Sequence, residues 1–135
     1  MSGKNVKILI VDDSRAMRAY IRGVLQDAYQ CSATEVQSGF EALRLLPREQ
    51  FDLIVTDINM PDINGLELIR FVRNSERHAG VPILIVSTQS SERDKQKVFE
   101  LGANRFVAKP FKPDALIQVV SELTKQNDNS DSVVK

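Results

Sequence analysis

Residues 7–13 read KILIVDD, a mostly aliphatic run that ends in the two carboxylates of Asp12 and Asp13. Three later runs have the same form: FDLIVT (51–56) precedes Asp57, VPILIV (81–86) precedes Ser87, and RFVA (105–108) precedes Lys109. If these runs are parallel strands, their carboxyl ends lie along one edge of a sheet, where open α/β sheets bind ligands. The sequence therefore predicts that carboxylates, a hydroxyl and an ammonium group converge at this edge.

Segments with helical periodicity separate the short apolar runs, an alternation that is typical of βαβ units and a parallel sheet. The expected strands cover residues 6–12, 32–37, 52–57, 82–87 and 105–108. The expected helices begin after Ser14, at Ser38, around Asn64, in the SSERD segment that starts at residue 90, and at Pro113. This alternation predicts a doubly wound α/β fold: a (βα)5, flavodoxin-like three-layer sandwich whose parallel sheet has the order 2-1-3-4-5. In that order the strand at 32–37 lies at an edge and contributes nothing to the site.

The expected helices differ in how many apolar side chains they offer to a core. The first offers Met17, Ile21, Val24, Leu25 and Ala28, and the third offers Leu66, Ile69 and Val72, with Phe71 as a further candidate. The fourth, in SSERDKQKVFELGA (90–103), offers only Val98 and Leu101, with Phe99 as a further candidate. We therefore expect the fourth helix to have the weakest docking, and Gly102 to end it.

Length and composition are those of one ordinary globular domain. The chain has 135 residues, of which 42% are hydrophobic and 27% charged. We expect a domain over 5–125 and a disordered tail over 126–135, where the sequence lacks periodicity. Lys and Arg number 18, as do Asp and Glu, so the formal charge is zero and no basic face predicts a nucleic-acid or membrane partner. No signal peptide and no apolar stretch near the ~20 residues that span a bilayer are visible, so we expect a cytoplasmic protein.

The acidic residues suit a metal and a phosphoryl group. Two adjacent carboxylates ionise together more readily when a cation joins them, and Mg2+ prefers oxygen ligands. We expect one of Asp12 and Asp13 to bind Mg2+ directly and the other through water; alternatively, one of them helps to cap the helix after Ser14. The Asp57 carboxylate can attack phosphorus to form an acyl phosphate, and the alternative is an Asx turn that leads into Asn59.

Two further strand ends carry groups that suit a phosphoryl oxygen. Ser87 can donate a hydrogen bond to it, and Lys109 can supply a positive charge. A single Ser or Lys at the end of a strand is more simply explained as an ordinary residue with no role in binding a phosphoryl group. Pro110 follows Lys109, and a cis peptide bond there would aim the ammonium inward.

Taken together, these segments resemble the receiver domain of two-component response regulators, in particular the chemotaxis-type single-domain receiver, over about residues 5–125. The matching segments are ILIVDDS (8–14), FDLIVTDINMPDINGLEL (51–68), ILIVST (83–88) and NRFVAKPF (104–111). The resemblance implies that Asp57 accepts a phosphoryl group from a sensor histidine kinase or phosphotransfer protein. It also implies that Asp12, Asp13, Asp57 and the Asn59 carbonyl hold Mg2+, that Ser87 and Lys109 contact the phosphoryl group, that Phe106 is a switch aromatic, and that the bond before Pro110 is cis.

The resemblance implies a phosphorylation-controlled binding module that assists its own phosphorylation and dephosphorylation but is not an enzyme. Its protein target would bind the face made by the fourth helix, the fifth strand and the fifth helix. We expect a monomer, with a phosphorylation-dependent dimer as an alternative. Two departures from the commonest pattern are Ser87 in place of threonine and Thr88 in place of alanine. Asn59 and Gln89 occupy positions that tune dephosphorylation in the family, so the lifetime of the phosphate stays open.

Three other interpretations compete with a stand-alone receiver. A receiver cut from a longer, multidomain response regulator would have the same sequence features. A flavin-binding protein of the same fold would need a Ser/Thr/Gly-rich loop after the first strand, where this chain has two acids. A Mg2+-dependent phosphatase of the haloacid dehalogenase type, which forms an aspartyl phosphate, would place its second acid two residues after the first, whereas Asp12 and Asp13 are adjacent.

The remaining reactive side chains have simpler interpretations. His78 precedes the fourth strand, at the end of the sheet opposite the expected site, which disfavours a role in proton transfer. Cys31 is the single cysteine and is best explained by packing of a strand. The basic residues Arg15, Arg18 and Arg22 form a solvated face of the first helix, or alternatively contact a phosphodonor.

Overall fold

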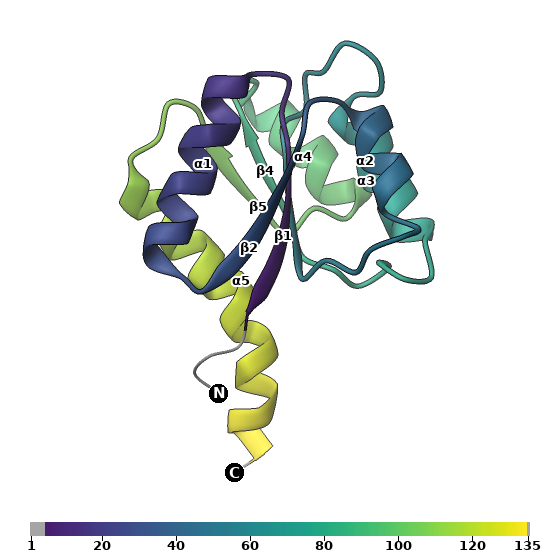
Figure 1. Cartoon of the computed structure of the whole chain (residues 1–135). Coiled ribbons are helices and arrows are strands. Elements are labelled where there is room, and N and C mark those ends of the chain that lie inside the picture. Colours follow the sequence, from purple (N-terminus) through teal and green to yellow (C-terminus); the bar gives the residue numbers. More distant parts are fainter. Residues whose placement is uncertain (1–4, 135) are drawn as a thin grey trace.

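The sheet at the centre of the molecule is parallel throughout and has the order β2-β1-β3-β4-β5 (Figure 1). The computed structural model describes the backbone of residues 5–134 and the side chains of residues 5–124. Within that range the strands are β1 (Val6–Val11), β2 (Cys31–Val36), β3 (Leu53–Thr56), β4 (Ile83–Ser87) and β5 (Arg105–Ala108). The helices are α1 (Arg15–Ala28), α2 (Gly39–Leu45), α3 (Gly65–Asn74), α4 (Glu92–Leu101) and α5 (Pro113–Val134). The predicted fold class and strand order are confirmed.

Helices cover both faces of the sheet and divide the core into two clusters. The helices α1 and α5 pack on one face, and α2, α3 and α4 pack on the other (Figure 1). Strand β1 serves both clusters, because alternate side chains of a strand point to opposite faces. Its Leu9 and Val11 join the cluster under α2–α4, whereas Ile8 and Ile10 join the cluster under α1 and α5. The nearly continuous apolar sequence of this strand therefore follows from burial on both sides.

The register of the sheet brings the strand ends level with one another. Val11 of β1 lies opposite Thr56 of β3, and Ser87 of β4 lies opposite Ala108 of β5. The residues that follow these positions therefore meet at a single edge, although they are far apart in the sequence.

Side chains cap the starts of several helices, and Ser14 does so where the sequence predicts it. Ser14 accepts a hydrogen bond from the backbone at the start of α1, and Asn64 and Ser91 each form a capping box, at α3 and α4. Gly102 ends α4 with a φ of 118°, a left-handed conformation that glycine adopts without a Cβ clash.

Some of the predicted core residues are exposed. Ala28 in the last turn of α1 is exposed, and so are Phe71 of α3 and Phe99 of α4. The two phenylalanines are exposed because neighbouring side chains of a helix point in different directions. Val72 and Val98, each one residue away from a phenylalanine, point into the core instead.

Arg73 at the end of α3 connects three segments at the end of the sheet opposite the aspartates. Its guanidinium donates to the Gly102 carbonyl (3.0 and 2.8 Å), to the Ala79 and Val81 carbonyls (3.0 and 2.6 Å) and to Asn104 Oδ1 (2.9 Å). The C-terminal end of α4 is thereby tied to α3 and to the chain that enters β4.

The C-terminal boundary of the domain stays a prediction. The helix α5 is assigned through Val134, whereas the sequence suggested a disordered tail over 126–135; the side chains after residue 124, and Lys135 as a whole, lie outside the described part. Among the described residues, no helix combines the length and the apolar character that crossing a bilayer requires.

Candidate functional site

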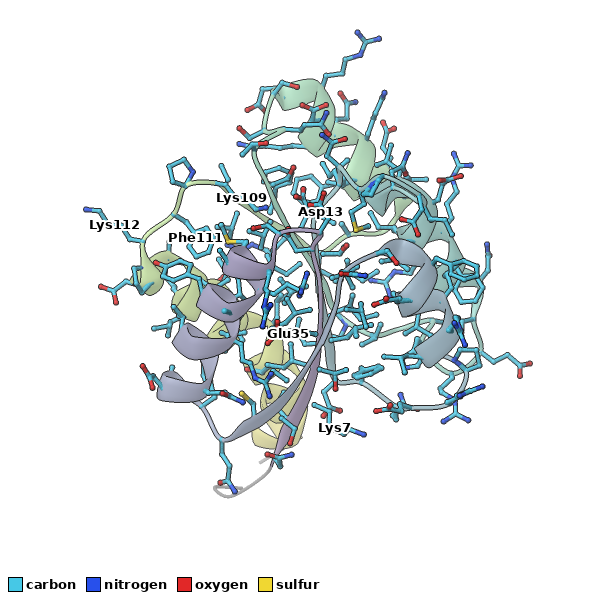
Figure 2. The ribbon with its side chains drawn as sticks, turned by 45° about the horizontal axis from the view of Figure 1, so that its top comes forward. Lys7, Asp13, Glu35, Lys109, Phe111 and Lys112 are labelled. Carbon is cyan, nitrogen blue, oxygen red and sulfur yellow. The ribbon has the colours of Figure 1, made fainter. Side chains whose placement is uncertain are left out.

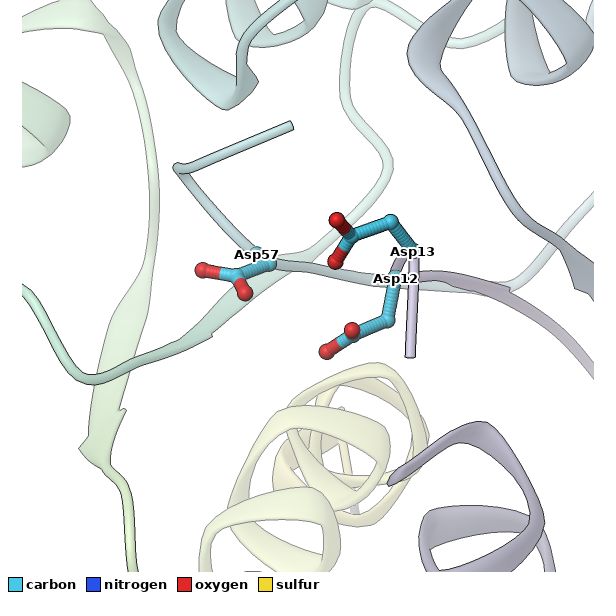
Figure 3. A group of neighbouring side chains, drawn as sticks. All are labelled: Asp12, Asp13 and Asp57. Atoms are coloured by element: carbon cyan, nitrogen blue, oxygen red, sulfur yellow. The ribbon is translucent and has the colours of Figure 1, made fainter. Parts of the chain in front are cut away.

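Three carboxylates converge at the carboxyl edge of the sheet. Asp12 follows β1 and Asp57 follows β3, and the Asp57 amide donates to the Val11 carbonyl at 3.0 Å because the two strands are paired. One carboxylate oxygen each of Asp12, Asp13 and Asp57 lies within 4.8 Å of the other two (Figure 3). Asp12 and Asp57 are buried, whereas Asp13 is exposed. The strand order predicts this convergence, and the structure has it.

Backbone amides hold the two buried carboxylates from one side. Asp57 Oδ1 accepts hydrogen bonds from the amides of Ile58 (2.7 Å) and Asn59 (3.3 Å). Asp12 Oδ1 accepts a hydrogen bond from the Ser14 amide at 2.9 Å. Each of these two residues thus has one carboxylate oxygen fixed by the turn that follows its own strand, and the second oxygen faces the rest of the site.

Lys109 binds that second oxygen of both buried aspartates. Its Nζ lies 2.7 Å from Asp12 Oδ2 and 3.0 Å from Asp57 Oδ2. Burial by itself lowers the pKa of Lys109, but the hydrogen bonds and charges of Asp12 and Asp57 outweigh burial and hold that pKa above its usual value. Lys109 therefore stays charged. With three carboxylates against one ammonium, two negative charges remain in excess, which a divalent cation would balance.

Lys109 and Asp13 lie together at the edge of the sheet in Figure 2, and Lys7 marks the other end of the strands. The Lys109–Pro110 peptide bond is cis. Asn59 is exposed beside Asp57 and touches it through its own backbone amide.

Ser87 and Phe106 lie on the two strands that follow β3 in the sheet, β4 and β5. Ser87 is fully buried at the end of β4; its Oγ accepts a hydrogen bond from the Gln89 amide at 3.1 Å, and it makes no hydrogen bond to the carboxylates within the described chain. Phe106 of β5 is half-buried against the cluster under α2–α4. The Nζ of Lys95 from α4 lies 5.7 Å from the centre of its ring.

Strand β2 does contribute to the site, contrary to the prediction. Its Glu35 binds Arg18 of α1 (Nε to Oε1, 3.2 Å), and Arg18 Nη1 donates to the Asp12 carbonyl at 2.7 Å. The expectation that Arg18 belongs to a solvated face is wrong, because only 12% of its side chain is exposed. No local sequence signal pairs Arg18 with Glu35, since the pair depends on how α1 packs over β2.

Gly65 is a second residue whose role the sequence did not indicate. A Cβ at this position would lie 2.4 Å from the Asp57 carbonyl oxygen and 2.8 Å from the Ile58 Cα. The Gly65 amide donates to the Ile58 carbonyl at 2.7 Å. Only glycine lets the first turn of α3 approach the backbone of Asp57 this closely.

His78 and Cys31 lie away from the site. His78 is buried at the other end of the sheet, where its Nε2 accepts a hydrogen bond from the Phe51 amide at 3.2 Å. Burial, together with the charge of Arg77, lowers its pKa. Cys31 is half-buried at the start of β2, and burial raises the pKa of its thiol.

Comparison with known proteins identifies the family of this fold and site. Residues 8–121 match the family model described as the response regulator receiver domain. The chain belongs to this family. Receiver domains are signalling switches, and 2-1-3-4-5 is the strand order known for flavodoxin and for a chemotaxis receiver.

The relatives of this receiver domain include chemotaxis proteins. The chemotaxis protein CheY of Pseudomonas aeruginosa is 36% identical over 118 residues, which are 87% of this chain and 95% of the relative. The high-resolution structure of the chemotaxis response regulator CheY4 of Vibrio cholerae superposes with a TM-score of 0.83 at 33% identity, covering 89% of this chain and 99% of that one. The receiver domain of a sensor histidine kinase from Pseudomonas aeruginosa, solved with a magnesium ion in its active site cleft, superposes with a TM-score of 0.81 at 26% identity, covering 90% and 98% of the two chains. This homology identifies the chain as a phosphoacceptor response regulator, and its aspartate cluster fits a Mg2+ site.

Proposed function

We propose that Asp57 is the phosphoacceptor of this receiver domain and takes its phosphoryl group from a phosphohistidine on a sensor histidine kinase or phosphotransfer protein. The observation that carries the proposal is the environment of the Asp57 carboxylate. It is buried at the end of the central strand, with Oδ1 held by two backbone amides and Oδ2 held by Lys109. A carboxylate fixed in this way keeps a constant orientation toward an incoming phosphorus atom.

The transfer step needs only the donor, the Asp57 carboxylate and one proton for the leaving imidazole. One Asp57 oxygen forms a bond to phosphorus while the bond between phosphorus and the donor's imidazole nitrogen breaks; the nitrogen keeps the electron pair, and the ring leaves as neutral imidazole with one proton, carried on its other nitrogen or taken from water. The product is an aspartyl phosphate. Lys109 supplies a positive charge beside the new phosphoryl oxygens, and the Ser87 hydroxyl supplies a hydrogen-bond donor once it turns toward them.

The donor set around the acceptor fits Mg2+. Asp12, Asp13 and Asp57 offer carboxylate oxygens within reach of one another, and the Asn59 carbonyl would add a neutral oxygen. A bound Mg2+ would neutralise charge on the phosphoryl oxygens. The two excess negative charges of the site support a divalent ion over a monovalent one. The solved receiver domain that carries magnesium in its cleft adds support from a relative.

The signal would leave through α4, β5 and α5, a surface for a downstream protein partner. When Ser87 moves toward the phosphoryl group, it vacates space beside Phe106, which is half-buried and can turn inward. A partner that prefers the inward state would then bind the phosphorylated chain more tightly. The names of the relatives support a role in chemotaxis signalling, and such a role would place the protein in the cytoplasm. The protein acts as a monomeric switch that assists its own phosphorylation and dephosphorylation, with a phosphorylation-dependent dimer as a further state.

Labelling with a small phosphodonor tests the acceptor. With Mg2+ and acetyl phosphate, the wild-type chain should gain one acid-stable, base-labile phosphate, and Asp57→Asn should gain none while it stays folded. The matched control is Asp62→Asn, an exposed aspartate in the loop that follows β3, which should label like the wild type. Full labelling of Asp57→Asn would disprove the assignment.

A further inference from the structure

Arg18 and Glu35 form a link between the edge strand and the acidic pair. The Arg18 guanidinium donates through Nη1 to the Asp12 carbonyl (2.7 Å) and through Nε to Glu35 Oε1 (3.2 Å). Arg22, one helical turn further along α1, donates to Glu35 Oε2 at 2.9 Å. Hydrogen bonds from Arg22 and Arg18 lower the pKa of Glu35, although partial burial opposes them. Figure 2 labels Glu35, on β2 beside α1.

The Asp12 backbone is consequently held on both sides. Its amide donates to the Val36 carbonyl of β2 at 3.2 Å, and its carbonyl accepts from Arg18. That carbonyl belongs to the peptide unit that joins Asp12 to Asp13. Because a peptide unit is planar, fixing its oxygen also fixes the direction in which the chain continues into Asp13. Asp13 is exposed, and its side chain takes part in none of the hydrogen bonds found among the described residues, so its place in the cluster depends on its backbone.

We propose that Arg18 is a positioning residue for the metal site: it holds the Asp12–Asp13 peptide so that both carboxylates converge with Asp57. This inference rests on the proposed Mg2+ site. Arg18 also carries a positive charge, which by itself would weaken the binding of a cation. Glu35 lies against the guanidinium and offsets that charge, so the positioning effect outweighs the repulsion.

The two effects of Arg18 have opposite signs, which makes the inference testable. If Arg18 only repelled the cation, its removal would tighten Mg2+ binding. If Arg18 only connected α1 to β2, its removal would lower the unfolding temperature and leave the Mg2+ affinity of the folded chain unchanged. If Arg18 positions the acidic pair, its removal weakens Mg2+ binding at temperatures where the chain is fully folded.

The experiment compares Arg18→Gln with Arg22→Gln by calorimetric titration of the metal-free chain with Mg2+. Both variants lose an arginine that binds Glu35, but only Arg18 touches Asp12. We expect Arg18→Gln to bind Mg2+ about 10-fold more weakly than the wild type, the size of effect typical of groups that orient metal ligands, and Arg22→Gln to bind like the wild type. Glu35→Gln, which leaves Arg18 present but more loosely held, should lose affinity to a smaller extent.

A second readout needs no metal. In nuclear magnetic resonance spectra of the metal-free chain, Arg18→Gln should shift the Asp13 and Ser14 amide signals, and Arg22→Gln should leave them in place. Unchanged or tighter Mg2+ binding by Arg18→Gln, or an equal loss in Arg22→Gln, would overturn the inference. Failure of the wild-type chain to bind Mg2+ would instead count against the proposed function, so the two failures are distinguishable.

Discussion

Val98 is the single buried side chain of α4, and its truncation should make the opening of that helix easier. The side chain is 0% exposed and packs in the cluster under α2–α4, whereas its neighbour Phe99 is 44% exposed. Val98→Ala removes two methyl groups, worth about 0.8 kcal/mol each on transfer. With the cavity left behind, we expect a cost of about 2 kcal/mol.

If α4 opens without the rest of the domain, this cost appears as local exchange. A change of about 2 kcal/mol corresponds to about 30-fold faster hydrogen exchange of the α4 amides, because 1.36 kcal/mol is a factor of ten. The amides of β1 and β3 exchange by opening of the whole domain, which exposes Val98 as well, so they should accelerate by a similar factor but from a slower wild-type rate. Hydrogen exchange followed by mass spectrometry measures the opening of α4 on peptides from residues 92–101 and the opening of the whole domain on peptides from residues 53–56.

The matched control is Phe99→Ala, which removes a larger but exposed side chain from the next position and should change exchange in α4 little. The reasoning would be refuted if the wild-type amides of α4 were protected as strongly as those of β3, since α4 would then open only with the whole domain. If Phe99→Ala accelerated exchange in α4 as much as Val98→Ala, the reasoning would also be refuted, because burial of Val98 would then not explain how α4 docks on the core.

Two further predictions concern charge. Lys109→Ala removes the ammonium that binds Asp12 and Asp57, so Mg2+ affinity measured by titration should stay the same or increase; a clear loss would contradict the arrangement of the site. The buried His78 has a lowered pKa in the folded chain, so the unfolded chain binds its proton more readily. Its contribution to stability is therefore complete above the ordinary histidine pKa of about 6.5 and decreases as the pH falls below it. Unfolding midpoints between pH 7.5 and 5.5 should fall less for His78→Gln than for the wild type, and parallel curves would show that His78 does not titrate differently in the two states.

The sheet and the site could be predicted from the sequence to different extents. Strands buried on both faces leave a continuous apolar run, so β1, β3 and β4 were visible, and the strand order then brought Asp12 and Asp57 together. The support that Arg18 gives to Asp12 was not visible, because it depends on a contact with Glu35 across two elements. An arginine on a helix surface has the same local sequence whether it faces water or a neighbouring strand.

The burial of a single polar residue could not be predicted from the sequence either. His78 lies in a polar loop, RNSERHAG (73–80), and nothing in that loop indicates that its ring packs beside Phe51. The same limit applies to Ala28, whose position in the helical repeat suggested burial although the last turn of α1 leaves it exposed.

Arg73 fixes only one end of α4. It holds the Gly102 carbonyl, whereas the capping box of Ser91 at the other end forms its hydrogen bonds within the helix itself. Because the C-terminal end is tied to α3, we expect a displacement that begins at Ser87 to tilt α4 about Gly102 instead of sliding it along its axis. Such a tilt would move the first turn of the helix furthest. A partner that contacts the end near Ser91 would therefore meet a larger change in geometry than one that contacts Leu101.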